Sequence, residues 1–86
     1  MRNVTIYTKS YCPYCQAALD LLKKKGVNMN EISVDGDREG QRAMAQRAGG
    51  RSTVPQIFVG DQHIGGCDDM YALDNAGKLD AILTQP

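Results

Sequence analysis

The 86-residue sequence predicts a small α/β domain in which helices cover both faces of a four-stranded mixed sheet, in the order β-α-β-α-β-β-α. A β-prone run at 4–8, a helical pattern at 13–25 and a second strand at 27–34 form a unit whose strands must pair in parallel through a right-handed crossover. A hairpin pattern at 56–64 adds two strands, at least one of them antiparallel. A chain of this length has room for one core, so we expect residues 1–86 to form a single domain.

The first half of the chain carries clear helix boundaries. Pro13 suits the first helical position because it has no N–H that would lack a partner there. Leu19 and Leu22 continue an apolar stripe that begins at Cys15, and Gly26 supplies a left-handed stop. After the second strand, Asp37 can cap a second helix that runs to about residue 48 and ends at the glycine pair 49–50.

The second half begins with the hairpin, whose strands 56–59 and 62–64 are joined by a turn at Gly60-Asp61. The polar and apolar alternation of the second of these strands predicts that His63 points into solvent. After the break at Gly65-Gly66, Asp68 or Asp69 can cap a third helix. A short amphipathic segment, 79–83, follows Gly77 and ends the pattern.

Composition excludes several classes of function. Ten basic and ten acidic residues cancel, and Lys23 to Lys25 form the sole basic cluster, so we expect no nucleic acid and no anionic membrane as partner. No apolar run approaches the roughly 18 residues of a membrane span. The N-terminus shows no signal-peptide pattern, which predicts a cytoplasmic protein. We also expect a monomer.

Cys12-Pro13-Tyr14-Cys15 is the most informative segment. It follows a strand and opens a helix, so the first sulfur lies at a helix N-terminus, where unpaired N–H groups and the helix dipole favour the thiolate. Lys9, three residues upstream, can add a positive charge near the sulfur. Cys15 lies one turn further in and can close a disulfide. We therefore expect Cys12 to act as the nucleophile and Cys15 as the resolving thiol.

Two other uses of these cysteines are less favoured. Three cysteines are an odd number, which argues against a disulfide scaffold in a cytoplasmic chain. Cys12, Cys15, His63 and Cys67 contain the donor types of a zinc site, but a glycine break separates the last two and they do not form the usual short-spaced ligand pair. We therefore expect no metal.

Two further segments resemble ligand-binding elements. In Thr53-Val54-Pro55 the proline begins a strand, and the backbone of Val54 would be free to pair with an extended peptide if the Val54-Pro55 bond were cis, although trans is the more common form. In the segment 65–69, the first turn of a helix offers N–H groups to a carboxylate and aspartates to an ammonium. The pattern suits an amino-acid head group, and it also fits an ordinary capped helix in which Cys67 is a small apolar residue.

Taken together and in this order, these three segments resemble the dithiol glutaredoxins, particularly the bacterial glutaredoxin-3 type, over essentially the whole chain. The resemblance implies a thioredoxin-like fold, a cis Val54-Pro55 bond, and reduction of protein disulfides and protein–glutathione mixed disulfides. Glutathione would be a co-substrate, with no bound cofactor.

The resemblance also implies a glutathione site. Val54 would pair with the cysteinyl backbone, with Thr53 and Pro55 beside it. The γ-glutamyl carboxylate would bind the amides of Cys67 and Asp68 next to Gly66. The remaining implied contacts are Asp69 to the ammonium and Lys9, Tyr14 and Gln56 near the glycyl end. Many family members have Ser or Thr in place of Asp68, so a role for its side chain is less expected than one for its backbone.

Two other functions remain to be distinguished. One is a glutathione-independent redoxin reduced by a flavoprotein reductase, although thioredoxin-type motifs usually place Trp before the first cysteine and this chain has none. The other is a metal or cluster carrier without redox turnover, against which Pro13 argues because cluster binding in this family mostly accompanies monothiol sequences.

Overall fold

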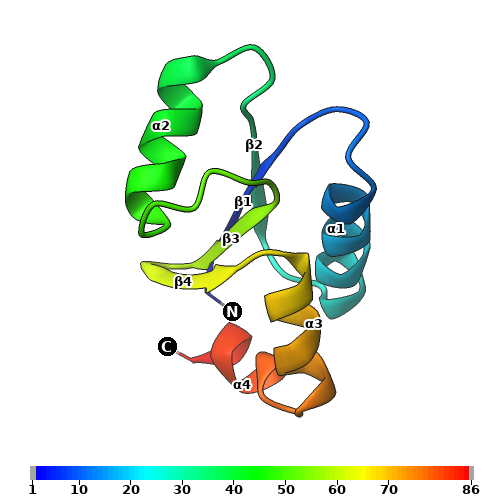
Figure 1. The fold of residues 1–86 in the computed structure, drawn as a ribbon. Helices are drawn as coiled ribbons and strands as arrows, with labels where there is room; N and C mark the ends of the chain where they lie inside the picture. Colours follow the sequence, from blue (N-terminus) through cyan, green and yellow to red (C-terminus); the bar gives the residue numbers. More distant parts are fainter. Residues whose placement is uncertain (1, 86) are drawn as a thin grey trace.

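The computed structural model describes residues 2–85 and contains a sheet with strand order β2-β1-β3-β4 (Figure 1). β1 pairs in parallel with β2 and antiparallel with β3, and β3 pairs antiparallel with β4. The predicted mixed sheet and thioredoxin-like α/β fold are confirmed, and the second strand is shorter than the predicted 27–34. The strands are β1 (Val4–Thr8), β2 (Met29–Ser33), β3 (Gln56–Val59) and β4 (Gln62–Gly65), and the helices are α1 (Pro13–Lys25), α2 (Arg38–Arg47), α3 (Cys67–Asn75) and α4 (Leu79–Thr84).

The larger core lies on the face of the sheet that α1, α3 and α4 cover (Figure 1). Alternate residues of the two central strands point into it, because side chains along a strand alternate between faces. Val4 and Ile6 from β1 meet Ile57 and Val59 from β3, and Leu22 from α1 packs against them without solvent exposure. This packing fixes α1 against the sheet.

The opposite face carries a smaller core beneath α2, built from Tyr7, Val34, Met44, Ala48 and Phe58. Tyr7 and Phe58 meet edge to face, with ring centroids 5.8 Å apart. The guanidinium of Arg47 lies 4.1 Å from the centre of the Phe58 ring, and its Nη1 donates to the Tyr7 hydroxyl at 3.1 Å. A cation therefore covers the outer side of this core, where a cation–π contact is favourable.

The ends of the first two helices follow the predicted chemistry. α1 ends at Gly26, whose φ of 70° lies in the left-handed region and whose N–H donates to the Lys23 carbonyl. The Asp37 carboxylate caps α2 by accepting from the Gly40 amide at 2.8 Å. Both helices therefore begin or end where the sequence indicates.

The prediction that Asp68 or Asp69 caps the third helix is wrong. Gly66 occupies the N-cap position, and α3 begins at Cys67. Asp69 is instead the third helical residue, and its carboxylate reaches back to accept from the Gly66 amide at 2.9 Å. Gly66 has an extended backbone and no side chain that could cap the helix. The carboxylate of Asp69, in the first turn, therefore accepts the hydrogen bond from the free Gly66 amide.

The prediction that His63 points into solvent is also wrong. The imidazole is half-buried, stacks on Phe58 with ring centroids 4.8 Å apart, and shares a 2.7 Å hydrogen bond between its Nε2 and Oε1 of Gln56. Alternation predicts a solvated face only where one side of a sheet is uncovered. Here Phe58 and Gln56 on the neighbouring strand β3 cover the imidazole.

Within residues 2–85, no helix is both long and apolar enough to cross a lipid bilayer.

We expect Leu22→Ala to lower the free energy of unfolding by about 3 kcal/mol, since it removes a fully buried side chain between α1 and the sheet. Lys24→Ala, an exposed change on the same helix, should alter it by less than about 0.5 kcal/mol. Urea denaturation of the reduced protein measures both values. A loss of similar size in the two variants would contradict the packing described for α1.

Candidate active site

Cys12 is the N-cap residue of α1. Its backbone is extended (φ −110°, ψ 102°), and its Sγ accepts a hydrogen bond from the Cys15 amide at 3.2 Å. The side chain is partly exposed at the end of the loop that follows β1. An amide donor and the positive end of the helix dipole both favour negative charge on this sulfur. Cys12 therefore lies at the helix N-terminus where the sequence placed it, and its sulfur is partly accessible.

Cys15 lies in the first turn of the same helix and is only 2% exposed. Burial raises the pKa of its thiol to about 12, and the hydrogen bond with Cys12 adds to the shift. A thiol with such a pKa stays protonated at neutral pH and is a poor first nucleophile. The two sulfurs are close together but chemically distinct, which is the arrangement that a redox pair requires.

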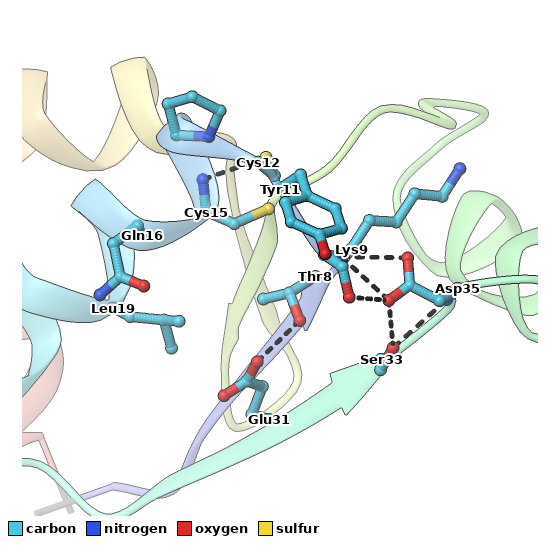
Figure 2. Close-up of a pocket in the computed structure, with 12 residues that line it drawn as sticks. Thr8, Lys9, Tyr11, Cys12, Cys15, Gln16, Leu19, Glu31, Ser33 and Asp35 are labelled. Atoms are coloured by element: carbon cyan, nitrogen blue, oxygen red, sulfur yellow. Dashed lines mark hydrogen bonds between the residues drawn. The ribbon is translucent and has the colours of Figure 1, made fainter.

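Lys9 does not place its charge beside the sulfurs. Its side chain extends away from Cys12 and Cys15 (Figure 2), while its backbone approaches Cys15 closely enough to lower the pKa of that thiol slightly against the larger effect of burial. The positive charge of Lys9 therefore does not lie beside the Cys12 sulfur, where it was expected to favour the thiolate. The amide of Cys15 and the helix N-terminus favour the thiolate instead.

A hollow of about 630 Å³ opens between β2 and the start of α1, and both cysteines contribute to its wall (Figure 2). Thr8 and Glu31 form its floor, where the threonine hydroxyl donates to the carboxylate at 2.8 Å. Asp35 forms its rim and accepts from both the amide and the hydroxyl of Ser10. These two donors hold the pKa of Asp35 below its usual range. The loop before Cys12 is thus tied to the end of β2.

A second, smaller groove of about 150 Å³ contains all the predicted ligand residues except Lys9 and Gln56. The Sγ of Cys12 lies 4.0 Å from the carbonyl oxygen of Val54, so the groove adjoins the nucleophile. The Val54-Pro55 bond is cis, as the resemblance implied. The residues that line the groove are Tyr14, Arg51, Thr53, Val54, Pro55, Gly66, Cys67, Asp68 and Asp69.

One end of this groove carries an ion pair. Oδ2 of Asp69 accepts from Nη1 of Arg51 and from the Gly66 amide, both at 2.9 Å. The Gly66 amide and then the guanidinium hold the pKa of Asp69 below its usual range. The amides of Cys67 and Asp68 lie at the first turn of α3, where helix geometry provides no internal acceptor. This end therefore presents an anionic carboxylate beside free N–H donors.

The sequence did not identify Arg51. Its only local signal is its place two residues before Thr53, and nothing in that spacing indicates a partner on α3. The contact arises because the loop before β3 and the first turn of α3 meet at the groove.

Gln56 lies beneath the groove and has no exposed surface. Its Nε2 donates to Oγ1 of Thr53 at 3.3 Å, and its Oε1 is bonded to His63. Burial, followed by the positive charge of Arg51, lowers the pKa of His63, which favours the neutral imidazole. Gln56 is therefore placed to orient Thr53 from below.

Cys67 forms part of the groove wall and is 7% exposed. Burial raises the pKa of its thiol, so it behaves as the small apolar residue that the sequence suggested. Among residues 2–85, no three or more His, Cys, Asp or Glu side chains are grouped closely enough to hold a metal ion. His63, whose imidazole a zinc site would need, is hydrogen-bonded to Gln56 instead.

Comparisons with known proteins agree on one family. The Glutaredoxin family model matches residues 4–64. A probable glutaredoxin of Synechocystis is 61% identical over 81 residues, which cover 94% of this chain and 92% of the relative. Glutaredoxin 3 of Escherichia coli K12 is 55% identical over 83 residues, which cover 96% and 99%. The crystal structure of a buckwheat glutaredoxin–glutathione complex is similar with a TM-score of 0.84 and 36% identity, covering 94% of this chain and 76% of that one.

We expect iodoacetamide at pH 7 to modify Cys12 and to leave Cys15 and Cys67 largely unmodified, because the latter two thiols are buried and their pKa values are raised. Peptide mapping by mass spectrometry after timed quenching measures the three rates. In Cys12→Ser, labelling of Cys15 should rise only at pH values well above 9.0, since burial remains. Comparable labelling of all three cysteines at pH 7 would contradict this description.

Proposed function

The chain belongs to the glutaredoxin family, whose members are thiol–disulfide oxidoreductases, and from this premise we propose that it uses glutathione to reduce protein disulfides and protein–glutathione mixed disulfides. The observation that carries the proposal is the contrast between the two sulfurs. Cys12 is partly exposed and accepts a hydrogen bond at a helix N-terminus, whereas Cys15 is buried with a pKa of about 12. Cys12 also adjoins a groove of the right chemistry for a zwitterionic peptide.

In the dithiol route, the Cys12 thiolate attacks one sulfur of a protein disulfide. A Cys12–protein disulfide forms, and the other protein sulfur leaves as a thiolate that takes up a proton. Cys15 then loses its proton and attacks Sγ of Cys12, which forms the Cys12–Cys15 disulfide and releases the second protein thiol. Two electrons pass to the substrate. Two glutathione molecules then reduce the Cys12–Cys15 disulfide and become oxidised glutathione.

In the monothiol route, Cys12 attacks the glutathione sulfur of a mixed disulfide and releases the protein thiol. A second glutathione then attacks the Cys12–glutathione disulfide, which frees Cys12 and forms oxidised glutathione. Cys15 takes no part in this route. The division is supported by the depth of Cys15, which can reach the sulfur of Cys12 from inside the helix but is shielded from an external sulfur.

The groove would hold the tripeptide along its length. Val54 would pair with the cysteinyl backbone, because its carbonyl already lies 4.0 Å from the sulfur of Cys12. The γ-glutamyl carboxylate would bind the amides of Cys67 and Asp68, where helix N-termini favour anions. Asp69 would accept from the glutamyl ammonium while Arg51 and the Gly66 amide keep its carboxylate ionised and oriented.

The three residues expected near the glycyl end would contribute differently. Tyr14 lines the groove and is 64% exposed, so it can contact the ligand directly. Gln56 would act through Thr53, to which it is hydrogen-bonded. Lys9 lines the hollow on the other side of the Cys12 loop, so it would act through its charge on the glycyl carboxylate.

The competing function is that of a glutathione-independent redoxin. Free helix amides and an ionised carboxylate at one end of the groove support glutathione binding, because a glutathione-independent redoxin has no need of a site for a zwitterionic head group. We further propose a monomer working in the cytoplasm, where reduced glutathione is available; the relatives reported above include bacterial glutaredoxins. Coupled assays with glutathione and glutathione reductase, or with thioredoxin reductase, separate the two functions.

We expect Cys12→Ser to abolish both reactions and Cys15→Ser to abolish only the reduction of protein disulfides. The serine in each case conserves volume, and Ser at position 12 can still cap α1. NADPH consumption coupled to glutathione reductase measures turnover of a disulfide-bonded protein and of a glutathionylated one. If Cys15→Ser lost both activities, the assignment of roles to the two sulfurs would be wrong.

We expect Asp69→Asn to raise the KM for glutathione about fivefold with little change in fold, because it removes the charge that would meet the ammonium at a half-exposed position. Asp68→Asn is the matched control. It removes the same charge from the next residue, where only the backbone amide has a ligand role, so KM should stay the same or fall. Circular dichroism checks the fold, and an equal rise of KM in both variants would remove the specific role of Asp69.

A further inference from the structure

Two large hydrophobic side chains are exposed in the part of the chain that the structure describes, and both flank Cys12. Tyr14 is 64% exposed and lines the proposed glutathione groove. Tyr11 is 103% exposed and has no part in that groove. Exposed apolar side chains that gather at one point of a surface mark an interaction site more often than scattered ones do. Tyr11 therefore requires an explanation of its own.

The backbone of Tyr11 is unusual as well. Its φ is 55°, and it is the one non-glycine residue with positive φ between residues 2 and 85. A tyrosine rarely adopts this left-handed conformation, and such strain persists where neighbouring contacts impose it. Here Asp35 holds Ser10 on one side through its amide and hydroxyl, and Cys12 caps α1 on the other. The loop is therefore held in a form that turns the ring outward.

Tyr11 lines the larger hollow (Figure 2), whereas other residues line the groove. The hollow measures about 630 Å³ against about 150 Å³ for the groove, and its lining mixes apolar side chains such as Pro13 and Leu19 with the carboxylates of Glu31 and Asp35. A broad surface of mixed polarity that carries an exposed aromatic side chain suits a polypeptide better than a small apolar ligand.

We propose that Tyr11 is a contact for the polypeptide part of glutathionylated protein substrates, while the glutathionyl part lies in the groove. This inference rests on the proposed function. As Cys12 attacks the glutathione sulfur, the Cys12–glutathione bond forms, the glutathione–protein bond breaks, and the protein sulfur leaves as a thiolate that is protonated by water. Since the tripeptide fills the groove side, the departing polypeptide lies over the remaining side, which Tyr11 and the hollow form.

The ring is suited to this role because it contributes nothing to the protein's own core. Its full exposure means that a partner can bury the whole ring, and aromatic side chains are prominent among the residues that carry binding energy at protein interfaces. The fixed loop also limits the number of conformations that must be frozen on binding. A small leaving group such as free cysteine offers little surface for the ring to contact, so its release should not depend on the residue.

Two substrates that share the glutathionyl group and differ in the leaving group test the proposal. One is glutathionylated serum albumin, and the other is the mixed disulfide of glutathione with cysteine. Tyr11→Asn removes the ring and keeps a residue that tolerates the left-handed conformation, and Tyr11→Phe keeps the ring. We expect Tyr11→Asn to lower kcat/KM for the albumin substrate about tenfold and to change it less than about twofold for the cysteine substrate. Tyr11→Phe should stay within about twofold of the parent on both.

The outcomes separate the inference from the proposed function. Loss on both substrates in Tyr11→Asn would show that the ring acts on Cys12 or on the loop, and no loss on either would show that it contacts no substrate; each overturns the inference. If the parent protein turned over neither glutathionyl substrate, the proposed function would fall, and the inference with it. A loss confined to albumin while the parent uses both supports the docking role.

Discussion

At the start of α1, the amide of Cys15 donates a hydrogen bond to the sulfur of Cys12, and the chemistry of the site depends on this contact. The sulfur takes the position that a serine or aspartate oxygen occupies in an ordinary helix cap. It is therefore both a structural element of the helix and the reacting atom. The larger core holds α1 against the sheet, so the same packing that stabilises the domain also aims the amide at the sulfur.

The two faces of the sheet serve the site in different ways. The face under α1 and α3 supplies the sulfurs and the first turn of α3, which are the groups that would meet a substrate. The face under α2 carries a chain of contacts that ends at the groove. Phe58 stacks on His63, and Gln56 is hydrogen-bonded to both His63 and Thr53. A change beneath α2 can thus reach the groove without touching it, since each of these side chains contacts the next.

The order of elements and the pairing of the two cysteines at a helix N-terminus could be predicted because they depend on local signals. Proline, glycine and aspartate at helix ends act within one turn. The C-x-x-C spacing at a strand–helix junction places the two sulfurs one turn apart at the start of the helix. His63 and the cap of α3 could not be predicted in the same way. The first depends on contacts of His63 with Phe58 and Gln56 on the neighbouring strand, and the second on Asp69 reaching back along its helix. Arg51 and Tyr11 depend on contacts between segments distant in sequence, which composition and spacing do not encode.

The glycine at the end of β4 limits how this surface can diversify. Gly65 has a φ of 116°, and a Cβ there would overlap the carboxylate of Asp69 and lie 2.9 Å from Nη1 of Arg51. Any other amino acid at this position would have to displace one partner of the charged pair. The charged end of the groove therefore depends on a residue without a side chain, and a substitution at position 65 would disturb the Asp69–Arg51 pair by steric overlap alone.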